Sequence, residues 1–136
     1  MTPPTKSYRL ESEIFVESGI DQSSASSRFH EWLRSDSKNL AVYEEPTGTG
    51  AELLIERHGN RFQIQVVEVA DRTWKVMVNK DANDDDHVVT DDGAFPGKFF
   101  QPAENIEDAA IHYFETGMRL RPDDWDDARV LDEFQH

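Results

Sequence analysis

The chain has 136 residues, contains no cysteine and carries a formal net charge of −14 at pH 7. Its length predicts a single domain, residues 1–136, with a sizeable core, and the lack of cysteine excludes disulfides and thiolate metal sites. No apolar run is long enough to span a membrane, and residues 1–8 lack the apolar stretch of a secretory signal. We therefore expect a soluble, cytoplasmic protein that contacts no membrane.

The acidic residues are concentrated in the C-terminal part of the chain. Residues 1–80 contain 12 acidic and 10 basic residues, a balance of −2, whereas residues 81–136 contain 16 acidic and 4 basic residues, a balance of −12. An acidic surface confined to one region favours a partner with a basic surface. The alternative is a solvated acidic face with a frayed tail. Direct nucleic-acid binding is not expected, because phosphate recognition requires clustered basic residues.

The first segments of the chain predict a strand and a helix. We expect residues 1–7 to form a loose leader, and partial apolar alternation from Tyr8 to Val16 predicts one strand. A helix is expected from about Ser23 to Arg34, because polar capping residues precede apolar residues at helical spacing. The predicted core residues of this helix are Phe29, Trp32 and Leu33.

The middle of the chain predicts an antiparallel meander, because short turn signals separate its alternating segments. A shift of the apolar parity at Val66-Val67 indicates either a bulge or burial of both strand faces. Trp74 is expected on the apolar face of the last of these strands. The expected strands are 40–45, 51–57, 62–66 and 74–78, and the expected turns are 46–50, Gly59-Asn60 and Asp71-Arg72.

An acidic loop is predicted over residues 81–97. It contains six aspartates and no lysine or arginine, and only Val88-Val89 suggests a brief strand. Irregular loops of this length in compact domains are usually functional or disordered. The loop is therefore the main candidate for a binding surface.

The same loop has a partial resemblance to a calcium-binding loop. Asp81, Asn83 and Asp85 stand at the spacing of calcium ligands. However, Asp86 occupies the position of the turn glycine, and Asp92 replaces the bidentate glutamate. We predict no metal site, and calcium binding is kept as an alternative.

The last helix is predicted from Asn105, as its N-cap, to Gly117, as a left-handed C-cap. Beyond Pro122, Trp125 is expected to pack in the core against this helix, and contact with a partner is the alternative. Residues 126–136 are expected to be an acidic tail. The apolar stripe of the helix comprises Ile106, Ala109, Ala110, Tyr113 and Phe114.

Together these elements predict an α+β fold. We expect a twisted antiparallel sheet of about four to six strands, arranged as a meander, with one N-terminal and one C-terminal helix packed on it.

Signatures of catalysis are lacking in the sequence. It has no nucleophile motif, no phosphate-binding glycine loop and no histidine pair at metal-ligand spacing. The adjacent carboxylates of Asp84, Asp85 and Asp86 are expected to be solvated and ionised, whereas acid–base chemistry needs carboxyl groups in different environments. We therefore expect no enzymatic activity and no cofactor. A small-molecule enzyme would need a carboxyl group with a strongly raised pKa in a pocket.

A set of C-terminal residues carries a resemblance to a known family. The set comprises Ala109, Ala110, Tyr113, Phe114, Thr116 and Gly117, followed by Arg121, Pro122 and Trp125. It is similar to the C-terminal signature of the first immunity-protein family of bacterial polymorphic toxin systems, which includes immunity proteins to cytidine-deaminase toxins. The order of the earlier elements also looks similar. The chain departs from the family pattern at Met118 and Leu120, and in a longer, more acidic tail after Trp125.

The resemblance implies a non-enzymatic protein that binds a cognate toxin domain and blocks its active site or substrate path. A toxin that acts on nucleic acid needs a basic surface, which an acidic loop can occupy. The alternative is an acidic protein-interaction or calcium-binding module without a toxin partner. The expected toxin contacts are Asp84, Asp85, Asp86, His87, Asp91 and Asp92, with Asp123 and Asp124 as secondary contacts.

Overall fold

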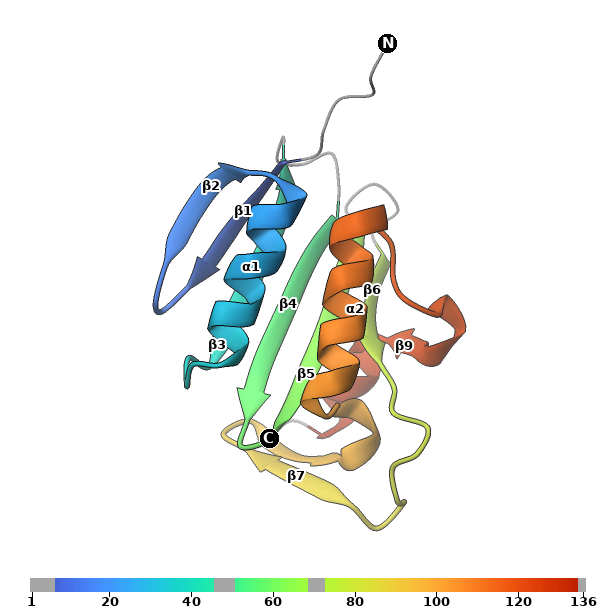
Figure 1. The fold of residues 1–136 in the computed structure, drawn as a ribbon. Helices are drawn as coiled ribbons and strands as arrows, with labels where there is room; N and C mark the ends of the chain where they lie inside the picture. Colours follow the sequence, from blue (N-terminus) through green and yellow to red (C-terminus); the bar gives the residue numbers. More distant parts are fainter. Residues whose placement is uncertain (1–6, 46–50, 69–72, 135–136) are drawn as a thin grey trace.

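Strands from both halves of the chain form a single antiparallel sheet. The computed structural model describes residues 7–45, 51–68 and 73–134. Within these residues, seven strands form one sheet in the order β2-β1-β3-β4-β5-β6-β9 (Figure 1). The strands are β1 (Ser7–Ser12), β2 (Val16–Ile20), β3 (Asn39–Glu45), β4 (Ala51–His58), β5 (Arg61–Glu68), β6 (Thr73–Met77) and β9 (Trp125–Asp127).

Two α-helices lie side by side on one face of this sheet, which we call the helix face (Figure 1). They are α1 (Gln22–Leu33) and α2 (Ala103–Thr116). Phe29 and Trp32 of α1 are fully buried, and the predicted stripe of α2 is buried along its length. These side chains pack against alternate residues of the strands, so the helical and strand periodicities meet in one core. None of the helices in the described residues is both long enough and apolar enough to cross a membrane.

Local capping residues define the start of α1 and the end of α2. Asp21 caps α1, because its Oδ1 accepts the backbone N–H of Ser24 at 2.8 Å. Gly117 ends α2 in the left-handed conformation at φ 72°, as the sequence predicts. The prediction of Asn105 as the N-cap of α2 is wrong, since the helix begins two residues earlier, after Pro102. The side chain of Asn105 instead donates to Oε1 of Gln101 at 3.0 Å.

The β4–β5 hairpin confirms the predicted Gly59-Asn60 turn. His58 pairs with Arg61, and Gly59 has a φ of 64°, a conformation that glycine adopts without strain. The pairing of β4 with β5 is regular along both strands, so β5 contains no bulge. Burial of both faces from Phe62 to Val66 explains the shift in apolar parity.

The opposite face of the sheet carries a second, smaller core. A hairpin of β7 (His87–Thr90) and β8 (Gly93–Pro96) lies at the end of the sheet where β4 turns into β5 (Figure 1). The 3-10 segments η1 (Gly97–Phe99) and η3 (Ala128–Phe134) add to this layer, and η2 (Pro122–Asp124) leads into β9. The buried residues of the second core are Val76, Phe95, Phe99, Phe100, Ala128 and Leu131.

The N-terminal strand prediction is corrected by a turn at Ser12. The hydroxyl of Ser12 accepts the backbone N–H groups of Ile14 and Phe15, both at 3.2 Å, and the chain reverses there. The single predicted strand from Tyr8 to Val16 is therefore two antiparallel strands, β1 and β2. Ile14 and Val16, which share the parity of the core residues, are 47% and 60% exposed.

Two further expectations change in the second half of the molecule. Trp74 does not lie in the apolar core but is 48% exposed on the second face of the sheet. Residues 126–134 do not form a free acidic tail, since β9 pairs with β6 and η3 buries Ala128 and Leu131. Trp125 is 6% exposed and packs in the main core, as predicted.

Some predicted segments lie outside the described residues. They are residues 1–6 of the leader, the 46–50 turn, Asp71-Arg72, and residues 135–136 of the tail. The acidic loop of residues 81–97 is described throughout, and it contains the β7–β8 hairpin where only a brief strand is predicted.

Candidate functional site

Four of the exposed acids of the predicted loop lie at the two ends of the β7–β8 hairpin. Asp84 and Asp85 precede β7, and Asp91 and Asp92 form its turn to β8; all four are exposed. His87, at the start of β7, is also exposed. None of these five side chains forms an ion pair with a described residue. These side chains are therefore exposed and form no ion pairs within the described part of the chain.

Asp86 is instead held by the protein itself. Its carboxylate forms a two-pronged ion pair with the guanidinium of Arg61 on β5, in which Nη2 donates to Oδ1 at 3.0 Å and Nη1 donates to Oδ2. The hydrogen bond from Arg61 lowers the pKa of Asp86 below its ordinary value. The ion pair anchors the hairpin to the sheet, and it engages the carboxylate of Asp86 within the protein.

The two secondary candidates on η2 differ in the same way. Asp123 is exposed, whereas the side chain of Asp124 is 21% exposed and bridges Lys80 at 2.6 Å and Arg121 at 3.1 Å. The hydrogen bond from Lys80 is the main cause of a lowered pKa at Asp124. Asp124 therefore joins η2 to the segment after β6, and only Asp123 has its carboxylate available.

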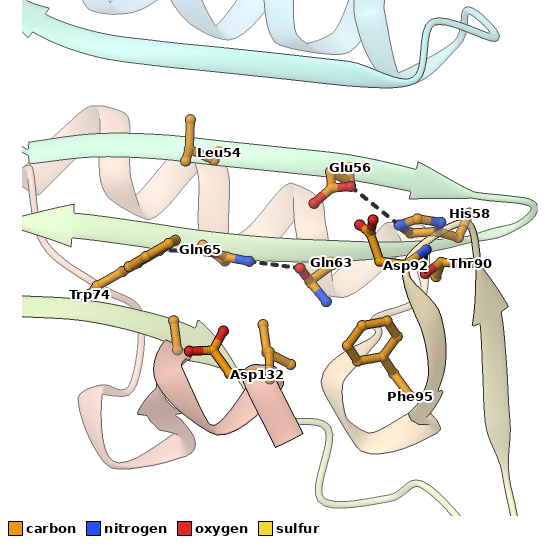
Figure 2. Close-up of a pocket in the computed structure, with 12 residues that line it drawn as sticks. Leu54, Glu56, His58, Gln63, Gln65, Trp74, Thr90, Asp92, Phe95 and Asp132 are labelled. Atoms are coloured by element: carbon orange, nitrogen blue, oxygen red, sulfur yellow. Dashed lines mark hydrogen bonds and ion pairs between the residues drawn. The ribbon is translucent and has the colours of Figure 1, made fainter. Parts of the chain in front are cut away.

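A groove lies beside the hairpin on the second face of the sheet (Figure 2). Its floor comes from β4 and β5, Trp74 of β6 stands at one end, and the hairpin and η3 form the remaining sides. The groove has a volume of about 260 Å³. The charged and polar residues that line it are Glu56, His58, Gln63, Gln65, Thr90, Asp92 and Asp132.

The charge of the groove is negative. Glu56, Asp92 and Asp132 contribute carboxylates from three separate elements, and no lysine or arginine is among the described residues that line it. Nε2 of His58 lies 3.6 Å from Oε1 of Glu56, so one carboxylate is partly engaged by an imidazole. Of the predicted contacts, only Asp92 belongs to this groove.

A chain of hydrogen bonds crosses the floor of the groove. Nε1 of Trp74 donates to Oε1 of Gln65 at 2.5 Å, and Nε2 of Gln65 donates to Oε1 of Gln63 at 2.7 Å (Figure 2). An indole N–H is only a donor, so Gln65 must present its oxygen to Trp74 and its nitrogen to Gln63. The orientation of both amides is therefore fixed by one tryptophan.

The sequence prediction did not identify most of the groove. Gln63 and Gln65 read as the polar face of a strand, yet they are only 7% and 9% exposed. One feature of the sequence indicates the groove: apolar residues occur at both odd and even positions of β5, as in a strand that is covered on both faces. Glu56 and Asp132 are far apart in the chain, and only the fold brings them to one groove.

The calcium-like spacing does not form a ligand cluster. Oδ1 of Asn83 accepts the backbone N–H of Asp85 at 3.0 Å, which is a local turn, and Asp86 faces Arg61. Across the described residues, no group of three His, Asp or Glu side chains lies close enough to hold a metal ion.

Comparison with known proteins finds a similarity of fold only. No family model matches the chain, and no curated protein matches it. The fold is similar to that in the crystal structure of a hypothetical protein from Neisseria gonorrhoeae, with a TM-score of 0.55 and 12% sequence identity over 86% of this chain and 92% of that chain. At this identity the two proteins share an architecture, and the similarity carries no information about function.

Proposed function

We propose that the chain is an immunity protein, a non-enzymatic inhibitor that binds a cognate bacterial toxin domain and covers its basic active site. The target class is a toxin that acts on nucleic acid, such as a deaminase. The observation that carries the proposal is the set of exposed carboxylates beside the groove. We call this set the acidic face, and it comprises Glu56, Asp91, Asp92 and Asp132.

The acidic face is suited to bind a basic surface. Asp91, Asp92 and Asp132 form no ion pair with a described residue, and Glu56 faces only His58. Exposed carboxylates that form no ion pair are accessible to a partner, and they speed association with basic surfaces and disfavour acidic ones. A surface that binds nucleic-acid phosphates is basic, so an acidic protein can occupy the same place.

The position of the acidic face also supports binding. Its residues come from β4, the β7–β8 turn and η3, and the hairpin is anchored by Asp86 to Arg61 on β5. A surface built on anchored elements loses little conformational entropy when a partner binds. Asp84, Asp85 and His87, at the other end of β7, extend the same acidic layer by about one strand length, roughly 10 Å.

The experiment is co-expression with the toxin domain encoded beside this gene. Induction of the toxin alone should stop growth, and this chain should restore it. The Asp91→Asn/Asp92→Asn variant should protect less well. A matched control, Glu104→Gln/Asp108→Asn, removes the same charge from exposed positions on α2 and should protect fully. The proposal is wrong if no toxin domain is encoded there, or if the chain gives no protection.

A further inference from the structure

The groove floor presents a hydrogen-bond donor that has no acceptor among the described residues. Trp74 fixes the orientation of the Gln65 amide, and the nitrogen of that amide donates to the side-chain oxygen of Gln63. The two N–H groups on the amide nitrogen of Gln63 therefore take no part in this chain of hydrogen bonds. This nitrogen donates to no described residue, although Gln63 is only 7% exposed. Gln63 extends from β5 into the groove with its nitrogen turned away from Gln65 (Figure 2). This nitrogen faces the open groove, where an acceptor on a ligand can replace water as its partner.

The rest of the groove requires a cation. Glu56, Asp92 and Asp132 line the groove from three elements, and their charges need a positive group once water is displaced. Trp74 adds an aromatic surface at one end, against which a cation can pack. A ligand for this groove therefore combines a positive group with a hydrogen-bond acceptor.

The size of the groove suits one amino-acid residue of a ligand. Its volume of about 260 Å³ lies below the roughly 300–1,000 Å³ typical of sites for drug-sized molecules. An arginine residue in an extended segment satisfies each requirement. Its guanidinium offers five donors in a planar fork that suits carboxylates and stacks on aromatic rings, and its main-chain carbonyl is an acceptor.

We propose that this groove binds one arginine residue of the partner protein, with the guanidinium among Glu56, Asp92 and Asp132 and the main-chain carbonyl on the amide nitrogen of Gln63. The identification of the partner as a toxin rests on the proposed function, whereas the recognition of an arginine residue does not. Gln63 and the three carboxylates are then specificity-determining residues. A partner with a neutral residue at that place would leave the carboxylates buried without a counter-charge, which is costly.

The test uses the intact protein and two small peptides. The probes are Gly-Arg-Gly, blocked at both ends, and the same peptide with citrulline, which has the shape of arginine but no charge. Binding is followed by the NMR signals of the Trp74 indole N–H and the Gln63 side-chain amide. The arginine peptide should shift both signals in a saturable way at millimolar concentration, and the citrulline peptide should not.

Two variants assign the contacts separately. Asp132→Asn, at an exposed position, should weaken binding of the arginine peptide at least about tenfold, because a charge-assisted hydrogen bond contributes about 1.5–3 kcal/mol. Gln63→Met keeps the size of the side chain and should also weaken that peptide. It should leave agmatine unaffected, since agmatine carries the guanidinium without a peptide carbonyl. If Gln63→Met does not fold, the wild-type preference for the arginine peptide over agmatine tests the same contact.

The outcomes separate this inference from the proposed function. Equal binding of the arginine and citrulline peptides, or no shift of the groove signals with either, overturns the inference even if the protein neutralises a toxin. Selective arginine binding in the groove sustains it even if no toxin is neutralised.

Discussion

The indole N–H of Trp74 on β6 donates to the side-chain oxygen of Gln65 on β5, at 2.5 Å. The exposed tryptophan thereby fixes the orientation of two nearly buried amides, those of Gln65 and Gln63. Trp74→Phe removes the donor but keeps an aromatic ring. We expect the free energy of unfolding to fall by only about 1 kcal/mol, the usual contribution of one hydrogen bond. The Gln63 side-chain amide should change its NMR signals, because its orientation is no longer imposed.

Trp125 is a buried tryptophan with which the effect of substituting the exposed Trp74 can be compared. It is 6% exposed, and its Nε1 donates to the carbonyl of Leu120 at 2.7 Å. Trp125→Phe should destabilise the protein more than Trp74→Phe in urea unfolding, because it also leaves space in the main core. Equal losses at the two positions would contradict the assignment of Trp125 to the core and Trp74 to the surface.

The ion pair of Arg61 with Asp86 predicts a pH-dependent contribution to stability. Arg61 lowers the pKa of Asp86 in the folded state, so the ionised carboxylate stabilises the fold above the unfolded-state pKa of about 3.9. This contribution is lost as the pH falls through the lowered pKa. Asp86→Asn should therefore lower the urea midpoint at pH 7, and its difference from the wild type should shrink below about pH 4.

The neighbouring Asp85 is the control for this prediction, since it is exposed and forms no ion pair with a described residue. Asp85→Asn should leave the midpoint nearly unchanged at both pH values. A wild-type advantage over Asp86→Asn that stays constant down to pH 2, roughly two units below the ordinary aspartate pKa, would exclude the ion pair as its cause.

Gly97 is required by its close approach to Asp86. Its backbone N–H donates to the carbonyl of Asp86 at 2.8 Å, and an added Cβ would lie only 2.6 Å from Cγ of that residue. Gly97→Ala should cost about 1–3 kcal/mol, as overpacking of a filled site does. In a double-mutant cycle the cost should be smaller in the Asp86→Ala background, where the carboxylate is missing. Additive costs would show that the two residues do not interact.

Tyr8 connects the first strand to the end of the last helix. Its hydroxyl donates to the carbonyl of Phe114 at 2.8 Å, and burial raises the pKa of Tyr8 to about 12. Because this value lies above the unfolded-state pKa of about 10, stability is kept below pH 10 and lost as the pH rises toward 12. Tyr8→Phe should cost about 1 kcal/mol at pH 7.

The Tyr8→Phe variant should also lose less stability than the wild type between pH 10 and 12, because it has one fewer tyrosine to ionise. Urea unfolding at several pH values measures both effects. Parallel losses of stability in the two proteins over this interval would show that Tyr8 does not contribute to the alkaline transition.

The sequence predicted those elements in which the spacing of the apolar residues matches the residues that the fold buries. Phe29 and Trp32 of α1 and the stripe of α2 repeat at helical spacing, and the structure buries them. Trp74 shares the parity of the buried Val76, but it lies beyond the part of the second face that η3 and the hairpin cover. The parity of a strand assigns residues to one face and does not show where that face is covered.

The additional strands and the groove depend on long-range contacts. The three residues of β9 show no alternation of their own, and they form a strand only because β6 offers an edge. Glu56, Gln63 and Asp132 belong to β4, β5 and η3, so no local pattern connects them. The loop prediction identified the acidic segment but not its hairpin, and the internal partners of Asp86 and Asp124 became visible only in three dimensions.

The rate of association with the proposed toxin partner, measured over a range of salt concentrations, tests the central claim most directly. For the wild type we expect fast association that slows steeply with added salt. Asp91→Asn/Asp92→Asn should associate more slowly, by about tenfold at low salt, and with a weaker salt dependence. Glu104→Gln/Asp108→Asn should behave as the wild type. Identical rates and salt dependence for all three proteins would contradict binding through the acidic face.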